Sequence, residues 1–469
     1  MIMNQRKTFI LLLLLPFIGK AQENFSFNLL EAQAYAVEHS YAVKNARIDA
    51  LSAESQVKEL TSIGLPQVYG TIDYQNFIDI PTQVAPADAF GFPAYLNEFL
   101  FGVAQETGVP INAPTTDPDA VSELKFGAPQ TMTAGISVSQ LIFDGSYFVG
   151  LQAAKAYADV MQGSIRRSEQ QVKDQVAQAY HTVLVAQKNV EALEGSAKVM
   201  DKILSETKSL QKSGFLEQQD VDQLQLTLND LNNKRDYASQ QKEIALLMLK
   251  FQLGVKGTDN VSLTDTIDNL TSADQTELSV HPFNLSNNID YQVQTDYRRL
   301  MDLNMKNEKA KALPSIGAFY NFQKNAQRDE FDFLDFDKTW YPIQIWGVQL
   351  SVPIWSSFQG KHRVQKARLE VERADLQLLQ IEDGANLEYK SARSEHTYAR
   401  KNMTNQEESH ALAQRIFEQT QIKYKEGVAS SMELAQAESQ LLTAYGSVIS
   451  ATLALLNASS RLNKALGRY

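Results

Sequence analysis

A long proline-free stretch that a glycine turn divides constrains the fold of this chain most. The stretch runs from Ile354 to Tyr469, and Gly427 interrupts it. Glycine enters left-handed backbone conformations at little cost, so Gly427 predicts a tight turn between two long helices. Gly214 stands 213 positions before residue 427 in a similar setting, and an acidic residue follows each glycine six positions later. The duplication predicts two helical hairpins of matched geometry.

The helices beside these turns carry heptad repeats. One seam is formed by Val172, Val176, Ala179, Val183, Ala186, Val190, Leu193, Ala197, Met200 and Leu204, and the other by Leu434, Ala437, Leu441, Ala444, Val448, Ala451, Leu455, Ala458 and Leu462. Small and β-branched residues at such positions predict coiled-coil packing. At about 1.5 Å per residue, an unbroken helix over residues 147–214 extends roughly 100 Å. An interrupted coiled coil folded into a compact bundle is the alternative.

Four segments instead show the two-residue period of a β-strand. They cover about residues 67–77, 131–143, 315–323 and 342–352, and each has one apolar face and one face of Thr, Ser, Gly, Asn and Gln. Strands of about ten residues cross a bilayer when tilted, with the polar face toward a wet lumen. A soluble sandwich is the alternative.

Four strands are too few to close a membrane barrel, which needs about eight. An open sheet edge in lipid leaves unpaired backbone groups that cost several kcal/mol each. If these strands lie in a membrane, the barrel must therefore be assembled from several copies of the chain.

The order of elements is helix, strand, strand and helical hairpin, and it occurs twice. The first repeat is expected over residues 22–254, with its hairpin at about 147–254. A polar linker covers residues 255–289, and the second repeat covers 290–469, with its hairpin at about 358–467. The first helix is expected over residues 28–59.

The N-terminus has the layout of a cleaved signal peptide over residues 1–21. Arg6 and Lys7 precede an apolar block over residues 9–18, and Ala21 ends a plausible cleavage site. An N-terminal membrane anchor is the alternative. The chain has no cysteine, which excludes a lipid-anchored start and disulfides, and export without cysteine fits the envelope of a Gram-negative bacterium. No run of eighteen apolar residues follows, so no membrane-spanning helix is expected.

Several function classes are disfavoured by composition. The net charge of −11 argues against nucleic-acid binding, which needs clustered Lys and Arg. The six histidines form no metal-ligand pair and no phosphate-binding glycine loop occurs, so we expect no enzyme and no cofactor.

Residues 78–130 are rich in Pro and Phe and predict a long irregular connection. The acidic loop around residues 329–337 lacks the spacing of a calcium site and predicts a solvated rim.

A set of short motifs points to a family. Leu65-Pro66 and Leu313-Pro314 precede the first and third strands, residues 139–145 and 351–355 follow the second and fourth, and the two glycine turns complete the set. The arrangement resembles the outer membrane factor family, the TolC-like efflux ducts, over almost the whole mature chain.

The resemblance implies a mostly helical protein with a membrane β-barrel. The family forms homotrimers, with a twelve-stranded barrel in outer membrane lipid and a twelve-helix tunnel in the periplasm. It works with a periplasmic adaptor and an inner-membrane pump of the RND or ABC type, and it performs no catalysis. The expected function is export of small molecules such as drugs and toxic metabolites. A type I protein secretion duct and a periplasmic coiled-coil adaptor or structural protein are the alternatives.

The resemblance also assigns roles at the hairpin tips. The positions where adaptor hairpins dock are matched by Ser213, Gly214, Phe215, Glu426, Gly427 and Val428. The pore constriction is matched by Asp220, Tyr424, Glu433 and Gln436. Two positions depart from the pattern: Ala429 replaces an arginine that pairs with the tip aspartate in some members, and Gln436 replaces a second ring aspartate.

Three copies of Glu433 on a narrow axis would repel one another, raise one another's pKa and attract cations. The alternative for Glu433 is a solvated residue in the first turn of a helix, where negative charge is mildly favourable.

Overall fold

The computed structural model describes residues 24–86, 94–110, 121–125, 127–271, 283–335 and 337–469. The expected signal peptide lies outside these ranges. The chain divides into two compact units, one formed by residues 1–57, 152–305 and 365–469 and the other by residues 58–151 and 306–364. Each unit therefore combines segments from both of the expected repeats.

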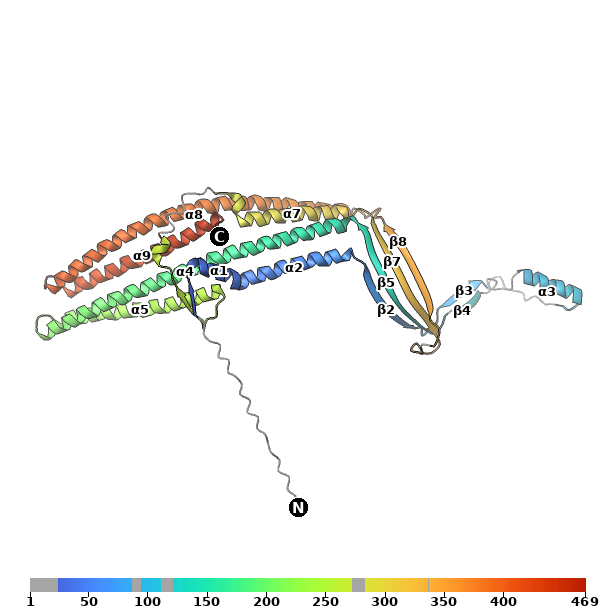
Figure 1. The fold of residues 1–469 in the computed structure, drawn as a ribbon, viewed down its shortest axis with the longest axis horizontal. Helices are drawn as coiled ribbons and strands as arrows, with labels where there is room; N and C mark the ends of the chain where they lie inside the picture. The colour runs from blue at the N-terminus through green and yellow to red at the C-terminus, as the bar shows by residue number, and fades with distance from the viewer. Residues whose placement is uncertain (1–23, 87–93, 111–120, 126, 272–282, 336) are drawn as a thin grey trace, which may run out of the picture. The chain divides into compact units, whose positions relative to one another are not determined.

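The second unit is built on a four-stranded antiparallel sheet with the order β2-β5-β7-β8 (Figure 1). Its strands are β2 (Gln67–Asn76), β5 (Gln130–Asp144), β7 (Ser315–Arg328) and β8 (Tyr341–Ser351). Within the described part of the chain, β2 and β8 have no strand on their outer sides. The sheet therefore has two open edges.

The register joins the apolar faces of the four strands into one surface. Val68 pairs with Val138, Val138 pairs with Tyr320, and Tyr320 pairs with Trp346. Val68 is 65% exposed and Trp346 is 78% exposed, so this face does not pack a core in the single chain.

The opposite face of the sheet carries polar rows. One row consists of Asp73, Thr133, Asn325 and Tyr341, and the Asn325 amide donates to the Thr133 hydroxyl at 2.8 Å. Successive side chains of a strand point to opposite faces, so the two-residue sequence period alone separates these polar rows from the apolar ones.

The long connection between β2 and β5 contains regular structure, so the expectation of an irregular segment is wrong. β3 (Thr82–Pro86) and β4 (Val121–Lys125) form an antiparallel ribbon, and α3 (Ala94–Thr107) lies between them in sequence. The prolines of this connection do not prevent the formation of short strands and a helix.

The first unit contains the helical hairpins. One hairpin joins α4 (Gly145–Lys212) to α5 (Gln218–Leu253), and the other joins α8 (Gln359–Lys425) to α9 (Ser431–Ala465). The two connecting turns lie at the same end of this unit (Figure 1). α4 has 68 residues and α8 has 67 without a break, which excludes the interrupted coiled coil.

Shorter helical elements of the described residues include α1 (Leu29–His39), α2 (Tyr41–Ile63), α7 (Ile289–Ala310) and the 3-10 turn η1 (Leu285–Asn287). The single first helix expected over residues 28–59 is wrong, because Ser40 is extended with ψ 144°. The Ser40 hydroxyl accepts a hydrogen bond from the Val43 amide at 3.4 Å, so Ser40 ends α1 and helps to start α2.

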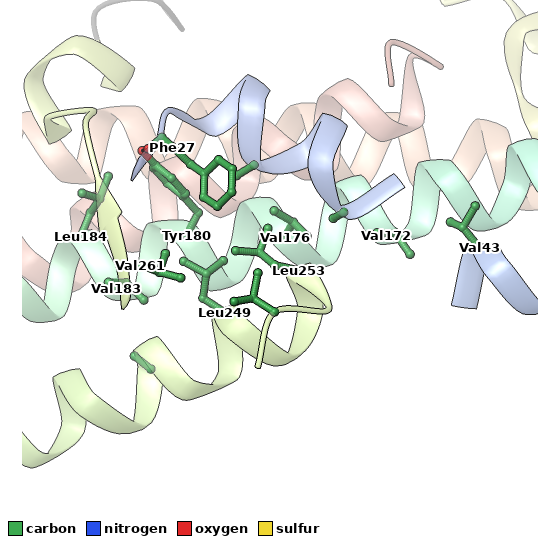
Figure 2. Packing of buried hydrophobic residues seen from close by; sticks show 14 residues of the cluster. Phe27, Val43, Val172, Val176, Tyr180, Val183, Leu184, Leu249, Leu253 and Val261 are labelled. Carbon is green, nitrogen blue, oxygen red and sulfur yellow. The ribbon is translucent and has the colours of Figure 1, made fainter. Parts of the chain in front are cut away.

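A core around α4 and α5 fixes the base of the first hairpin (Figure 2). Val176 and Tyr180 of α4 pack with Leu249 of α5, and all three side chains are fully buried. The linker contributes β6 (Asn260–Leu263), which pairs in parallel with β1 (Asn24–Phe27). The Tyr180 hydroxyl donates to the Phe27 carbonyl at 3.0 Å and ties this small sheet to α4.

One helix of the described residues, α9, is long and apolar enough to cross a membrane by length and composition. The sequence expectation counted only consecutive apolar residues and missed α9, where Ser and Thr are interleaved with Ala and Leu. Leu434, Leu441 and Leu455 of this helix are buried in the single chain, which accounts for part of its apolar character.

Candidate functional site: the two hairpin tips

The turn between α4 and α5 is closed by backbone hydrogen bonds. Gly214 has φ +81°, and the Phe215 amide donates to the Leu210 carbonyl at 3.0 Å. This is a Schellman ending, in which a left-handed residue lets the chain satisfy the last carbonyls of a helix. Glycine is the residue that takes this conformation without a steric penalty.

The turn between α8 and α9 repeats that geometry. Gly427 has φ +72°, and the Val428 amide donates to the Lys423 carbonyl at 2.8 Å. The apolar residue after a Schellman glycine frequently packs on its own helix. Here Phe215 is 78% exposed and Val428 is 76% exposed. Both tips therefore present an apolar side chain to their surroundings.

The acidic residue after each turn occupies the third position of the next helix. The Glu217 amide donates to Asp220 at 3.3 Å, and the Ser430 amide donates to Glu433 at 2.7 Å. Carboxylates in this position satisfy free amides at a helix start. Glu433 also accepts from the Ser430 hydroxyl at 3.1 Å. The Ser430 amide, followed by its hydroxyl, lowers the pKa of Glu433 below its ordinary value.

Two hydrogen bonds connect the hairpins to each other at their tips. The Ser431 hydroxyl donates to the second oxygen of Asp220 at 2.7 Å, and the Tyr424 hydroxyl lies 2.9 Å from the Thr207 hydroxyl. Burial raises the pKa of Tyr424, Thr207 opposes the shift, and the charge of Asp220 adds to it. We call the pair Asp220–Ser431 and Thr207–Tyr424 the hairpin latch.

An apolar cluster lies behind the latch. Its buried side chains come from α4, α5, α8 and α9: Ala197, Met200, Ile203, Leu204, Val221, Leu224, Leu228, Leu231, Phe417, Leu434, Ala437 and Leu441. The two hairpins thus share one buried core near their tips, so separating them requires the loss of this contact as well as of the latch.

The comparison with protein families gives a match over the second of the two expected repeats. The model of the family described as "Outer membrane efflux protein" matches residues 284–468. Residues 284–468 are therefore similar to the outer membrane efflux protein family. No curated protein matches this chain.

Solved structures extend the similarity to the whole fold. The crystal structure of the Campylobacter jejuni CmeC outer membrane channel matches with a TM-score of 0.69 at 17% identity, over 94% of this chain and 85% of that chain. The open state of the Neisseria gonorrhoeae MtrE outer membrane channel matches with a TM-score of 0.69 at 14% identity, over 94% and 89%. The Vibrio cholerae outer membrane protein VceC matches with a TM-score of 0.65 at 13% identity, over 94% and 96%.

These similarities confirm the fold class expected from the sequence. The chain has the fold of TolC-like outer membrane channels, with a four-stranded sheet and two long helical hairpins. The matched segment of residues 284–468 includes α8, the second glycine turn and α9, so it contains half of the candidate site.

The structure places the sequence-predicted residues of this efflux-type fold in two groups. The docking candidates Ser213 and Glu426 are exposed beside the two glycines, together with Phe215 and Val428. Of the constriction candidates, Asp220 and Tyr424 are partly buried in the latch. Glu433 and Gln436 are exposed on α9.

Sequence reasoning missed Thr207 and Ser431. Thr207 follows Leu204 by three residues, which is the next step of the α4 heptad. Ser431 precedes Leu434 by three residues, one turn of α9. Both side chains are buried, with exposed fractions of 1% and 5%. A polar residue at the tip end of each apolar seam is the signal that would have identified both.

Metal chemistry has no support at this site. The described residues contain no group of three or more His, Asp or Glu side chains arranged to hold a metal ion. The acidic loop after β7 is occupied by ion pairs instead: Arg328 lies 3.1 Å from Asp332, and Lys338 pairs with the same carboxylate. The solvated rim expected from the sequence of this loop stays a prediction.

Proposed function

We propose that the chain is the outer membrane channel of a tripartite export system, passing small molecules from an inner-membrane pump to the exterior. The single observation that carries the proposal is the two-faced sheet joined to unbroken hairpins. The rows Val68–Val138–Tyr320–Trp346 and Asp73–Thr133–Asn325–Tyr341 lie on opposite faces of the same four strands. An apolar outer face and a polar inner face are what a membrane barrel with a wet lumen requires.

The open sheet edges support assembly into a homotrimer. β2 and β8 each leave one side of their backbone unpaired among the described strands. In lipid these groups need partners, and pairing β8 of one copy with β2 of the next supplies them. Three copies provide twelve strands, above the minimum of about eight.

The helices leave apolar side chains that a neighbouring copy would cover. On α5 these are Tyr237, Ile244, Leu247, Met248 and Phe251, and on α8 they include Leu369, Leu376, Leu379 and Leu387, all of them more than half exposed or close to it. Contiguous exposed apolar surface marks an interaction site. The helices of three copies would in this way close a tunnel in the periplasm below the barrel.

The hairpin tips are proposed as the periplasmic entrance. Phe215 and Val428 project beside Gly214 and Gly427 and would meet the hairpins of a periplasmic adaptor. The latch would hold the entrance closed, while Glu433 and Gln436 on the exposed side of α9 would face the axis. The pump behind the adaptor would be of the RND or ABC type, and the channel would need no catalytic group or cofactor.

The proposal is tested by fractionation followed by electrophysiology. We expect the mature protein in outer membrane fractions of a Gram-negative host, a trimer after detergent extraction, and pores in planar bilayers. Recovery of the protein only as a monomer in the soluble periplasmic fraction would contradict the proposed function.

A further inference from the structure

A buried carboxylate in α9 has no part in the latch. Glu438 is 2% exposed, which is less than any other acidic side chain among the buried polar residues of the described chain. One of its oxygens, Oε1, has no hydrogen-bond partner there. The other interacts with the side chain of Ser196 on α4. Glu438 therefore lies at the contact between the two hairpins, with Ser196 of α4 beside it and one oxygen without a hydrogen-bond partner.

The surroundings of Glu438 are apolar. Its neighbours along α9, Leu434, Ala437 and Leu441, belong to the cluster shared by the hairpins, and Ala197 beside Ser196 belongs to the same cluster. Burying an ionised carboxylate without full hydrogen bonding is costly, so such a group neutralises instead. Burial raises the pKa of Glu438, and the Ser196 hydrogen bond offsets part of the shift.

No charge on the neighbouring helices compensates Glu438. The charged side chains nearest along α4, Glu194 and Lys198, are exposed, as are Glu408 and Arg415 of α8. Lys234 of α5 pairs with Asp230 at 2.7 Å, His410 of α8 lies against the Tyr445 ring, and Glu433 of α9 is held by Ser430. Burial and Ser196 are the only causes of the shift in the pKa of Glu438.

We propose that Glu438 makes the contact between the two hairpins pH-dependent, so that ionisation of this carboxylate loosens the closed tip. A neutral Glu438 fits the apolar cluster, whereas an ionised one is stabilised by water, which reaches it only when α9 moves away from α4. The link to channel opening rests on the proposed function; the change in the hairpin contact does not.

The direction of the effect follows from the sign of the shift. The pKa of Glu438 is raised in the closed arrangement relative to its ordinary value of 4.5. The contact is therefore most stable at acidic pH and weakens as the pH rises through the raised pKa. Ionisation of Glu438 shifts the equilibrium toward the loosened hairpin contact, and the hydrogen bonds of the latch oppose that shift.

The absence of cysteine from the chain allows a direct test of the contact. Ala197 is 5% exposed in the shared cluster, and an Ala197→Cys variant reports water access by its rate of maleimide labelling. An exposed Lys198→Cys variant corrects for the reactivity of the thiol itself. The full-length protein is labelled in detergent between about pH 5 and pH 8, a range that lies above the ordinary pKa of a glutamate.

We expect the corrected labelling rate of Ala197→Cys to rise several-fold toward pH 8. Adding Glu438→Gln, which keeps the shape and stays neutral, should hold the rate at its acidic value over the whole range. The matched control Glu194→Gln removes an exposed carboxylate two residues from Ser196 and should retain the rise. A rise that persists in Glu438→Gln, or no rise in Ala197→Cys, would overturn the proposal.

A second variant covers the case in which Glu438→Gln fails to fold. Ser196→Ala removes the hydrogen bond that lowers the pKa of Glu438, so the rise in labelling should begin at a higher pH than in the parent. An unchanged or lower onset would contradict the proposal. If labelling follows these expectations but planar bilayers show no pores, the pH dependence of the hairpin contact is supported and the proposed channel function is contradicted.

Discussion

The two hairpin tips have the same backbone but use their acidic residues differently. Both turns end a long helix at a left-handed glycine, with φ +81° at Gly214 and +72° at Gly427. Asp220 uses one oxygen for its own helix and the other for Ser431 of the second hairpin. Glu433 uses Oε2 for both hydrogen bonds to its own cap residue, Ser430.

The difference shows how a duplicated element acquires two tasks. The acid of the first tip connects two hairpins, whereas the acid of the second stabilises the start of its own helix. The position six residues after the glycine is the same in both, so the identity of the cap and the presence of Ser431 decide the outcome. Ala429 carries no charge, and the Asp220–Ser431 hydrogen bond connects the hairpins without an ion pair at that position.

The largest effect is expected from removing the latch. Ser431→Ala combined with Tyr424→Phe deletes one hydrogen bond to a carboxylate, about 2 kcal/mol, and one between hydroxyls, about 1 kcal/mol. The hairpins should separate more readily, which would raise single-channel conductance in planar bilayers. Thr420→Ala, on an exposed turn of α8 whose hydroxyl bonds only its own helix, is the matched control. Equal conductance in the double variant and the control would show that the latch does not hold the tip.

Substituting the turn glycines should have the next largest effect. Gly214→Ala and Gly427→Ala each force a side chain into the left-handed region, at a cost of about 1–2 kcal/mol. An added Cβ meets nothing within 4 Å at either position, so the cost is conformational and should be equal in the two turns. Hydrogen exchange of the turn amides measures it. A loss of amide protection in only one of the two turns would show that the two tips are not equivalent.

The parts of the fold that follow local periodicity were predictable from the sequence. The heptad seam of α4 and the two-residue period of β5 and β7 each depend on one element, and the structure has both. The β1–β6 pair was not predicted, because it joins segments more than 230 residues apart, as between Asn24 and Asn260. No local pattern distinguishes such short strands from a polar linker.

The candidate site, like the fold, was predictable from the sequence only where it depends on local structure. The glycines and their exposed neighbours could be read from the turn pattern, since a Schellman ending is a local structure. The partners Thr207 and Ser431 depend on the register between two hairpins, which the sequence of neither hairpin contains. Their place at the tip ends of the seams was visible, but which acidic or phenolic group each one meets was not.

A smaller effect is expected from the helix cap of the second tip. Ser430→Ala removes the hydroxyl that accepts from the Glu433 amide at 3.2 Å and should destabilise the first turn of α9 by about 1 kcal/mol. Glu217→Ala at the corresponding position keeps the amide that donates to Asp220 and should cost less. Amide exchange at the start of α5 and α9 compares the two. A larger loss of amide protection at the start of α5 would contradict the conclusion that the cap side chain matters more in the second tip.

The pH dependence of that cap has a defined sign. The Ser430 amide and hydroxyl lower the pKa of Glu433 relative to its ordinary value of 4.5. The contribution of Glu433 to the start of α9 is therefore complete above pH 4.5 and disappears as the pH falls through the lowered pKa. The protection factor of the Ser430 amide, which corrects for the intrinsic pH dependence of exchange, should fall on acidification in the parent protein. Unchanged protection of that amide at acidic pH would show that Glu433 does not cap α9.

The smallest structural effect is expected from Glu433→Gln, which tests whether this capping residue also faces the pore axis. The amide oxygen of Gln still accepts from the Ser430 amide, so the helix start should remain. Both hydrogen bonds to Glu433 from Ser430 use Oε2 and leave Oε1 outside the cap. Three such carboxylates near an axis would attract polyvalent cations. Block by a trivalent cation in planar bilayers should therefore weaken in Glu433→Gln, and Glu426→Gln on the outer turn should leave it unchanged. Equal block in all three proteins would restrict Glu433 to its helix cap, in contrast to Asp220, which also bonds Ser431 of the other hairpin.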